Sequence, residues 1–211
     1  MKSKNIQFTY LYDPLCGWCY GASPVLQKIA ENYPLVLQPT GLFSGTGRKM
    51  TAEFAHHAWT NDQRINKLTG QQFSEDYLHN ILETESNFDS YNILLALAAV
   101  RQIAPEQEMK ALNALQEVRY ISGRDNTDFA VITEVLEMLG LGKAVELCQT
   151  EATKQMVEQQ IEQGQQLASL HQVQGVPNVI LHKGEEQGII PNQFLYQDPE
   201  KLLTALQEIG K

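Results

Sequence analysis

Two cysteines separated by two residues are the strongest chemical signal in this sequence. They stand in the segment Cys16-Gly17-Trp18-Cys19. A thiolate is the nucleophile of thiol–disulfide exchange, and this spacing leaves the second thiol close enough to form a disulfide with the first. A disulfide between them would close a very small loop and would add little chain-entropy stabilisation. The pair therefore predicts redox chemistry rather than a structural disulfide.

The elements around this motif should place the first cysteine at the start of a helix. Residues 6–12 are β-branched, aromatic and apolar, which is typical of a strand, and Asp13-Pro14 ends it. Apolar residues recur at helical spacing from Cys19 onward. Cys16 then falls near the first helical turn, where free N–H groups and the helix dipole favour a thiolate. We expect Cys16 to be the more exposed nucleophile and Cys19 the more buried partner.

Composition restricts the classes of function. The chain has 211 residues, 43% of them hydrophobic, and can bury a core without disulfide crosslinks. Its net charge of −9, with no run of lysine and arginine, argues against binding to nucleic acid or an anionic membrane. No stretch has the length of a membrane span, and residues 1–5 lack the pattern of a secretory signal. With one cysteine pair and a solitary Cys148, these features predict a cytoplasmic protein.

The remaining pattern predicts an α/β fold split by helices. Residues 34–39 read as a second strand, and residues 51–170 are almost entirely helical in pattern. Strand character returns at 178–182, a partner strand begins at 189–190 after a turn, and a closing helix follows residues 198–199. We therefore expect a discontinuous domain of residues 1–50 and 171–211, interrupted by an all-helical insert of residues 51–170.

Four details of the insert can be predicted. Thr127 is the expected N-cap of a helix over residues 129–139. A long helix is expected over residues 143–170, with an interruption near Gly164. Within that helix Cys148 should be buried and act as a small hydrophobe. Arg124, which stands in the polar loop 123–128, should pair with a carboxylate.

These features together resemble the DsbA-like branch of the thioredoxin superfamily. The resemblance rests on Cys16 and Cys19 after the first strand, the helical insert, Pro24 in the first helix, and Gly175-Val176-Pro177 immediately before a strand. Trp18 inside the motif is similar to cytosolic, bacterial-type members described as disulfide oxidoreductases or isomerases. The resemblance implies a thioredoxin-like fold, with a central mixed sheet interrupted by a large all-helical insert.

The resemblance also implies a function and its residues. Cys16 and Cys19 would be the catalytic redox pair of a disulfide reductase or isomerase acting on protein or peptide disulfides, with glutathione a further candidate partner. Val176 and Pro177, joined by a cis peptide bond opposite the cysteines, would bind substrate together with Trp18. No bound cofactor and no metal are implied, and the sequence leaves the oligomeric state open.

The dipeptide between the cysteines predicts the direction of the chemistry. Gly17 and Trp18 bring no cation to the first sulfur, and Asp13 would disfavour a thiolate nearby. We therefore expect a thiol less acidic than that of the strongest oxidants and a more reducing couple.

Alternatives to a redox enzyme remain. A glutathione-dependent isomerase or transferase, of the chromene-carboxylate isomerase or kappa class, shares this split fold but typically has serine at the first cysteine position. A non-catalytic peptide-binding module would use the Val176-Pro177 edge without its cysteines. Zinc would need four ligands, and a second cysteine pair is absent.

Overall fold

Strands and helices follow one another in the expected order in the computed structural model, which describes residues 6–209, with side chains through Leu206. Residues 1–5, on which the expectation about a secretory signal rests, lie outside the described residues. The elements of the sheet-forming part are β1 (Ile6–Tyr12), α1 (Gly17–Asn32), β2 (Leu35–Pro39), β3 (Asn178–Lys183), β4 (Glu186–Ile189), a 3-10 turn (Asn192–Tyr196) and α9 (Pro199–Ile209). The elements between β2 and β3 are α2 (Ala52–Thr69), α3 (Glu75–Tyr77), a π-helical turn (Leu78–Leu82), α4 (Tyr91–Ile103), a 3-10 turn (Pro105–Gln107), α5 (Glu108–Tyr120), α6 (Phe129–Met138), α7 (Gly142–Cys148) and α8 (Glu151–Leu170).

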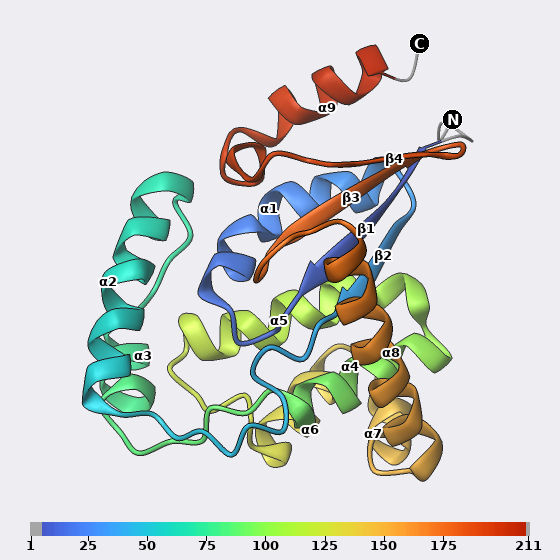
Figure 1. Cartoon of the computed structure of the whole chain (residues 1–211). Coiled ribbons are helices and arrows are strands. Elements are labelled where there is room, and N and C mark those ends of the chain that lie inside the picture. Colours follow the sequence, from blue (N-terminus) through green and yellow to red (C-terminus); the bar gives the residue numbers. More distant parts are fainter. Residues whose placement is uncertain (1–5, 210–211) are drawn as a thin grey trace.

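The sheet is mixed, and its order is β2-β1-β3-β4. β1 pairs parallel with β2 and antiparallel with β3, and β3 pairs antiparallel with β4. β1 has neighbours on both edges and is buried along almost its whole length, which explains its nearly continuous run of apolar and aromatic residues. In Figure 1, α1 runs behind the sheet and α8 lies in front of it, where it packs against β2.

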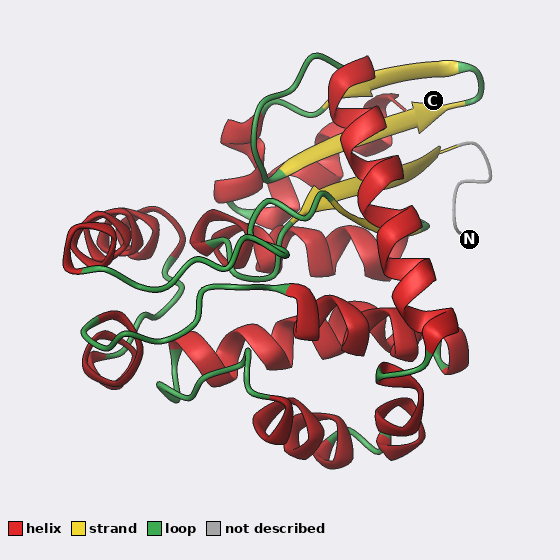
Figure 2. Cartoon of the chain, turned by 60° about the horizontal axis from the view of Figure 1, so that its bottom comes forward, coloured by secondary structure: helices red, strands yellow, loops and turns green. Residues whose placement is uncertain are grey.

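The helical segment packs onto the sheet-forming part rather than standing apart from it. Figure 2 shows its helices below the strands, with α8 reaching up to the sheet. α4 is buried on nearly all sides, as its unbroken apolar sequence predicts, and one hydrophobic cluster joins β1 and α1 to α4 and α5. The division into residues 1–50 with 171–211 and residues 51–170 stays a prediction, and the core of this structure is common to both parts.

The expected long helix of residues 143–170 is two helices, and the prediction of a break near Gly164 is wrong. α7 ends at Cys148, and α8 begins after Thr150, whose hydroxyl caps the new helix by accepting from the Thr153 N–H. α8 continues through Gly164, where the missing side chain makes room for the backbone of β2. A Cβ atom on Gly164 would lie 2.1 Å from the Pro39 carbonyl oxygen.

Two further boundaries differ from the sequence prediction. The N-cap of α6 is Asp128, whose carboxylate accepts from the Ala130 N–H, whereas the Thr127 hydroxyl donates to Asp125. β4 begins at Glu186, because a tight turn centred on Gly184, with a φ of 61°, returns the chain at once to pair with β3. At the start of α6 two adjacent polar residues could serve as the cap, and the structure selects Asp128.

The close contact between Gly164 and the backbone of β2 can be tested by replacing Gly164 with alanine and comparing the effect with the same replacement at Gly142. Gly164→Ala should lower the free energy of unfolding by about 1–3 kcal/mol, because the added methyl meets backbone atoms that cannot turn aside. Gly142→Ala is the matched control: Gly142 lies in α7 with open space around it, so this variant should be neutral or stabilised by about 0.4–1 kcal/mol. Urea unfolding of both variants checks the expectation, and equal effects would contradict it.

Candidate active site

Cys16 lies at the point where the chain turns from β1 into α1. It is the N-cap of α1, with extended backbone angles, and its carbonyl accepts the first helical hydrogen bond, from the Tyr20 N–H at 3.1 Å. The Cys16 N–H donates to the Asp13 carbonyl oxygen at 3.1 Å, which closes the turn before the helix. The Cys16 sulfur therefore stands at the positive end of the helix dipole, as predicted, where a thiolate is favoured.

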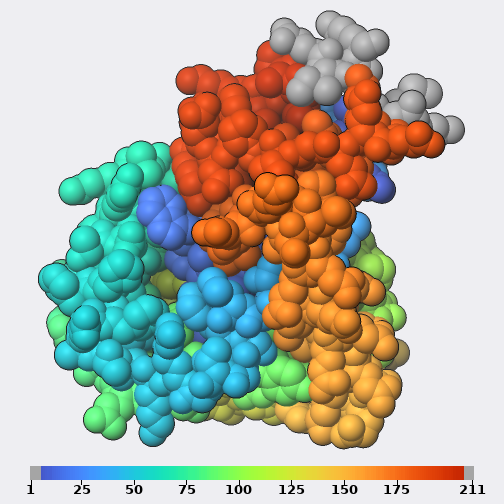
Figure 3. Space-filling view, in the orientation of Figure 1, coloured from blue at the N-terminus to red at the C-terminus, as the bar shows by residue number. Residues whose placement is uncertain are grey.

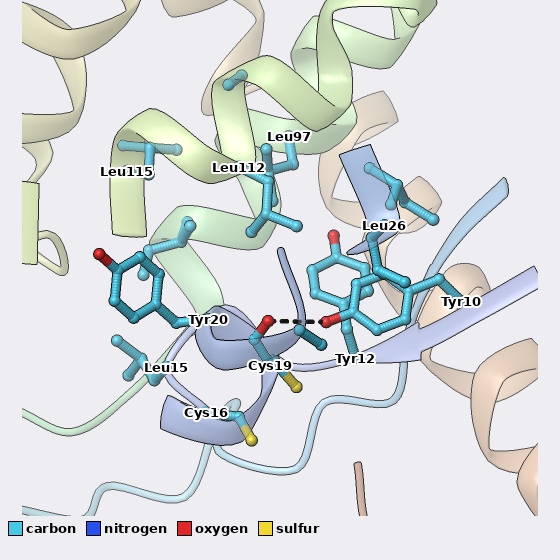
Figure 4. Packing of buried hydrophobic residues seen from close by; sticks show 14 of the residues in the cluster. Tyr10, Tyr12, Leu15, Cys16, Cys19, Tyr20, Leu26, Leu97, Leu112 and Leu115 are labelled. Atoms are coloured by element: carbon cyan, nitrogen blue, oxygen red, sulfur yellow. Dashed lines mark hydrogen bonds between the residues drawn. The ribbon is translucent and has the colours of Figure 1, made fainter. Parts of the chain in front are cut away.

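The two cysteines differ in exposure in the direction predicted. Cys16 is 7% exposed and Cys19, one turn further along α1, is 1% exposed. Burial raises the pKa of Cys19 well above its usual value, and the neighbouring Cys16 thiol raises it further. The Tyr10 hydroxyl donates to the Cys19 carbonyl oxygen at 3.3 Å and holds this turn of the helix against β1 (Figure 4). Cys19 is thus the thiol that keeps its proton.

The segment before β3 meets the first cysteine. The Val176–Pro177 peptide bond is cis, as the resemblance implied. The Cys16 thiol donates to the Val176 carbonyl oxygen at an S···O distance of 3.7 Å. Residues 160 positions apart in the sequence are therefore neighbours in this site.

Trp18 is half-buried and contacts both parts of the structure. Its ring packs edge-on against Tyr196, with ring centroids 5.2 Å apart. The Arg64 guanidinium of α2 lies over the Trp18 ring, 5.8 Å from the ring centroid. This cation could not be found from the motif alone, because α2 brings it from a distant part of the sequence. The role of Trp18 in substrate binding stays a prediction.

Asp13 has a structural role that its position in the sequence did not show. Its carboxylate is fully buried and accepts hydrogen bonds from the Leu15 N–H, the Phe43 N–H and the Ser90 hydroxyl, each at 3.0 Å. Burial raises the pKa of Asp13 to about 6, although the three donors favour the ionised form. The sequence suggested that the charge of Asp13 opposes a thiolate at Cys16, and this stays a prediction. The structure adds that Asp13 fixes the loop that carries Cys16.

A cavity of about 200 Å³ opens beside the first cysteine. Its walls come from the start of α1, the loop after β2, α2 and α3, and they include Cys16, Trp18, Phe43, His57, Asp62 and Tyr77. Figure 3 shows the surface hollowed where the N-terminal segment, in dark blue, meets α2, in teal. A larger cavity of about 850 Å³ lies between α2 and the π-helical turn and is lined by neither cysteine of the motif.

Helix α2 approaches α1 closely because two glycines face it. A Cβ on Gly17 would lie 2.5 Å from the Asp62 Oδ1 atom, and a Cβ on Gly21 would lie 2.5 Å from Ile65. The spacing of these glycines, one helical turn apart, was the available signal for this contact. Gly17 therefore has a packing role as well as a place between the cysteines.

The other residues singled out in the sequence lie outside the thiol pair. Cys148 is fully buried, its thiol donates to the Ala144 carbonyl oxygen at 3.2 Å, and burial raises its pKa to about 11, as suits a small hydrophobe. Arg124 pairs with Glu134 at 2.6 Å, as predicted. His56 and His57 are exposed on α2, and His57 reaches the rim of the cavity beside Cys16.

A family model described as the DSBA-like thioredoxin domain matches residues 9–207. The chain belongs to this family. Among solved structures, it is similar to the cytosolic disulfide reductase DsbM from Pseudomonas aeruginosa, with 27% identity, a TM-score of 0.87, and coverage of 96% of this chain and 97% of that one. A structure of DsbM with GSH matches equally well, with 27% identity, a TM-score of 0.86, and coverage of 96% and 98%. A comparison with curated proteins finds no match.

A more distant solved structure shares the fold. It is 2-hydroxychromene-2-carboxylate isomerase, with 16% identity, a TM-score of 0.61, and coverage of 96% of this chain and 95% of that one. At this identity the likeness shows the fold alone. The family match and the similarity to DsbM confirm the predicted DsbA-like family, the thioredoxin-like fold with its helical insert, and the enzyme class of thiol–disulfide oxidoreductases.

Among residues 6–209, no helix combines the length and the apolar character needed to cross a membrane. Among the same described residues, no three histidine, cysteine or acidic side chains are grouped so that they could hold a metal ion.

The role of Asp13 predicts a difference between two variants. Asp13→Asn places an NH₂ group where N–H or hydroxyl donors converge, so it should lower the free energy of unfolding at pH 7 by about 1–3 kcal/mol. Ser90→Ala removes a single donor and should cost only about 0.5–1.5 kcal/mol. Urea unfolding measures both, and an Asp13→Asn variant as stable as the unmodified protein would show that the carboxylate does not fix the loop.

Proposed function

We propose that the protein reduces or isomerises protein or peptide disulfides, with Cys16 as the nucleophile and Cys19 as the resolving thiol. The observation that carries the proposal is the difference between the two thiols. Cys16 stands at the start of a helix and lines a cavity, whereas Cys19 is buried with a raised pKa. A nucleophile needs a thiolate that substrate can reach, and a resolving thiol needs protection until the mixed disulfide forms.

The reaction would proceed in two exchanges. The Cys16 thiolate attacks one sulfur of the substrate disulfide, forms a mixed disulfide, and releases the other substrate sulfur as a thiolate that takes up a proton. Cys19 then attacks the Cys16 sulfur, gives up its proton, and releases the second substrate thiol. The enzyme is left with a Cys16–Cys19 disulfide, which a thiol reductant such as glutathione must reduce. No bound cofactor takes part in this sequence.

Val176, Pro177 and Trp18 are proposed to hold the substrate. The Val176 carbonyl oxygen faces the Cys16 sulfur, so an extended peptide pairing with this segment of backbone would bring its own cysteine beside the nucleophile. Trp18 lines the same cavity as Cys16 and offers an apolar surface next to it. The same residues would suit a small thiol peptide such as glutathione.

A reducing role is favoured over an oxidising one. The dipeptide between the cysteines brings no cation to the sulfur, which argues against a strongly stabilised thiolate. The similar DsbM is named as a cytosolic disulfide reductase, and one of its structures contains GSH. The similarity supports our further proposals that the protein acts in the cytoplasm and that thiol or disulfide peptides, glutathione among them, are its partners.

Cysteine variants test the assigned roles. In an insulin reduction assay with dithiothreitol, Cys16→Ser should reduce the rate to the uncatalysed background, because the nucleophile is lost. Cys19→Ser should accumulate a mixed disulfide between Cys16 and substrate, visible as a mass adduct. Cys148→Ser is the matched control and should keep full activity, since Cys148 is buried in α7. A Cys16→Ser variant with full activity towards glutathione-dependent isomerase substrates would favour that alternative class instead.

The reduction potential tests the direction of the reaction. Equilibration in glutathione buffers should give a value nearer to that of thioredoxin, about −270 mV, than to that of DsbA, about −120 mV. The Cys16→Ser variant provides the baseline, because it cannot form the disulfide. A potential near the DsbA value would make the protein an oxidant and would contradict the proposed role.

A further inference from the structure

An acidic side chain of the helical segment shares the cavity of the first cysteine. Asp62, on α2, is 3% exposed, and its Oδ1 atom lies against the Cα of Gly17, the residue after Cys16. Both Asp62 and Cys16 line the cavity of about 200 Å³. The two-exchange reaction described above gives this carboxyl no task, although burying an acid has a substantial energetic cost.

The surroundings of Asp62 hold it in place from a second direction. The Tyr77 hydroxyl of α3 donates to the Asp62 Oδ2 atom at 3.2 Å. The fully buried guanidinium of Arg119 lies over the Tyr77 ring, 5.7 Å from its centroid. The titratable and charged groups around Asp62 are Cys16 at the start of α1, Tyr77 on α3, Arg119 and Tyr120 on α5, and His57 on its own helix.

A thiol and a carboxyl group, both of them acids, therefore line the same cavity. If Cys16 and Asp62 were both ionised, their negative charges would repel each other in surroundings that screen charge poorly. When Cys16 enters a disulfide its charge is lost, and this repulsion disappears. A negative charge on Asp62 would then be opposed less when Cys16 is in a disulfide than when it is a thiolate.

We propose that Asp62 is a general acid that holds a proton while Cys16 is a thiolate and releases it when Cys16 forms a disulfide. The proposal rests on the proposed function. In the first exchange the Cys16 thiolate forms the new S–S bond and the substrate disulfide breaks, with its electron pair leaving on the second substrate sulfur. That thiolate takes the proton of the Asp62 carboxyl and leaves as a thiol, while Asp62 becomes a carboxylate. Reduction of the Cys16–Cys19 disulfide returns the proton to Asp62.

The proton affinity of Asp62 suits this exchange. Burial raises the pKa of Asp62 to about 7, although the Tyr77 hydrogen bond and the Arg119 charge both lower it. A free substrate thiol has a pKa of about 8.5, so transfer of a proton from Asp62 to a departing thiolate is favourable. At neutral pH both protonation states of Asp62 are then accessible.

The pH profile of Cys16 alkylation tests the coupling without any turnover. The rate at which iodoacetamide modifies Cys16 in the reduced protein would be followed by peptide mass spectrometry from pH 4 to pH 9. In the unmodified protein the rate should rise in two steps, because ionisation of Asp62 opposes formation of the thiolate. Asp62→Asn should show one step, and roughly tenfold faster alkylation at pH 8, because a neighbouring negative charge is removed.

Two further variants separate coupling from packing. Tyr77→Phe keeps the ring and the Asp62 carboxyl but removes a hydrogen bond to the carboxylate, so the first step should move to higher pH. Glu53→Gln removes an exposed acid from the first turn of the same helix and should leave the profile unchanged.

The outcome is decisive even if one variant fails to fold. A folded Asp62→Asn variant with the profile of the unmodified protein would overturn the proposal and leave Asp62 as a packing residue beneath Gly17. If Asp62→Asn does not fold, an unshifted profile in Tyr77→Phe overturns it equally. Because alkylation requires only the reduced thiol, loss of oxidoreductase activity in the insulin assay is a separate result that concerns the proposed function alone.

Discussion

The buried carboxylate of Asp13 joins the three chain segments on which the site depends. It receives the backbone N–H of Leu15 before α1, the N–H of Phe43 in the loop after β2, and the hydroxyl of Ser90 before α4. A carboxylate can be buried at low cost only when hydrogen-bond donors of the protein replace the water molecules that would otherwise solvate it. The three segments must therefore stay together for the Asp13 carboxylate to remain buried. The turn that ends at Cys16 is fixed as a result.

The helical segment contributes part of the site itself. α2 lies directly on the first turns of α1, because Gly17 and Gly21 present no side chains to it (Figure 1). This approach places Asp62 and His57 in the cavity of Cys16, and Arg64 over Trp18. The environment of Cys16 is therefore set by residues of the helical segment as much as by the helix at whose start it stands.

Burial divides the chemistry between the two cysteines. Both sulfurs belong to one hydrophobic cluster, and Figure 4 shows Cys19 enclosed next to Tyr10 and Tyr12 while Cys16 lies at the edge. The apolar surroundings raise the pKa of Cys19, which keeps it a thiol. Cys16 has the helix dipole on one side and the Val176 carbonyl on the other, so substrate can be aligned where the thiolate forms.

The sequence by itself determined the strands and most helices, the cysteine pair at a strand-to-helix junction, and the DsbA-like family, because periodicity, prolines and glycines act over a few neighbouring residues. It misplaced the cap of α6, where the adjacent Thr127 and Asp128 compete for the same role, and it placed near Gly164 the break that lies before α8. Only the tertiary structure showed the partners of Asp13, which lie 30 and 77 positions away, and the position of Asp62 against Gly17. Such contacts depend on how closely whole helices approach, and that distance is decided by packing across the molecule rather than by spacing along the chain.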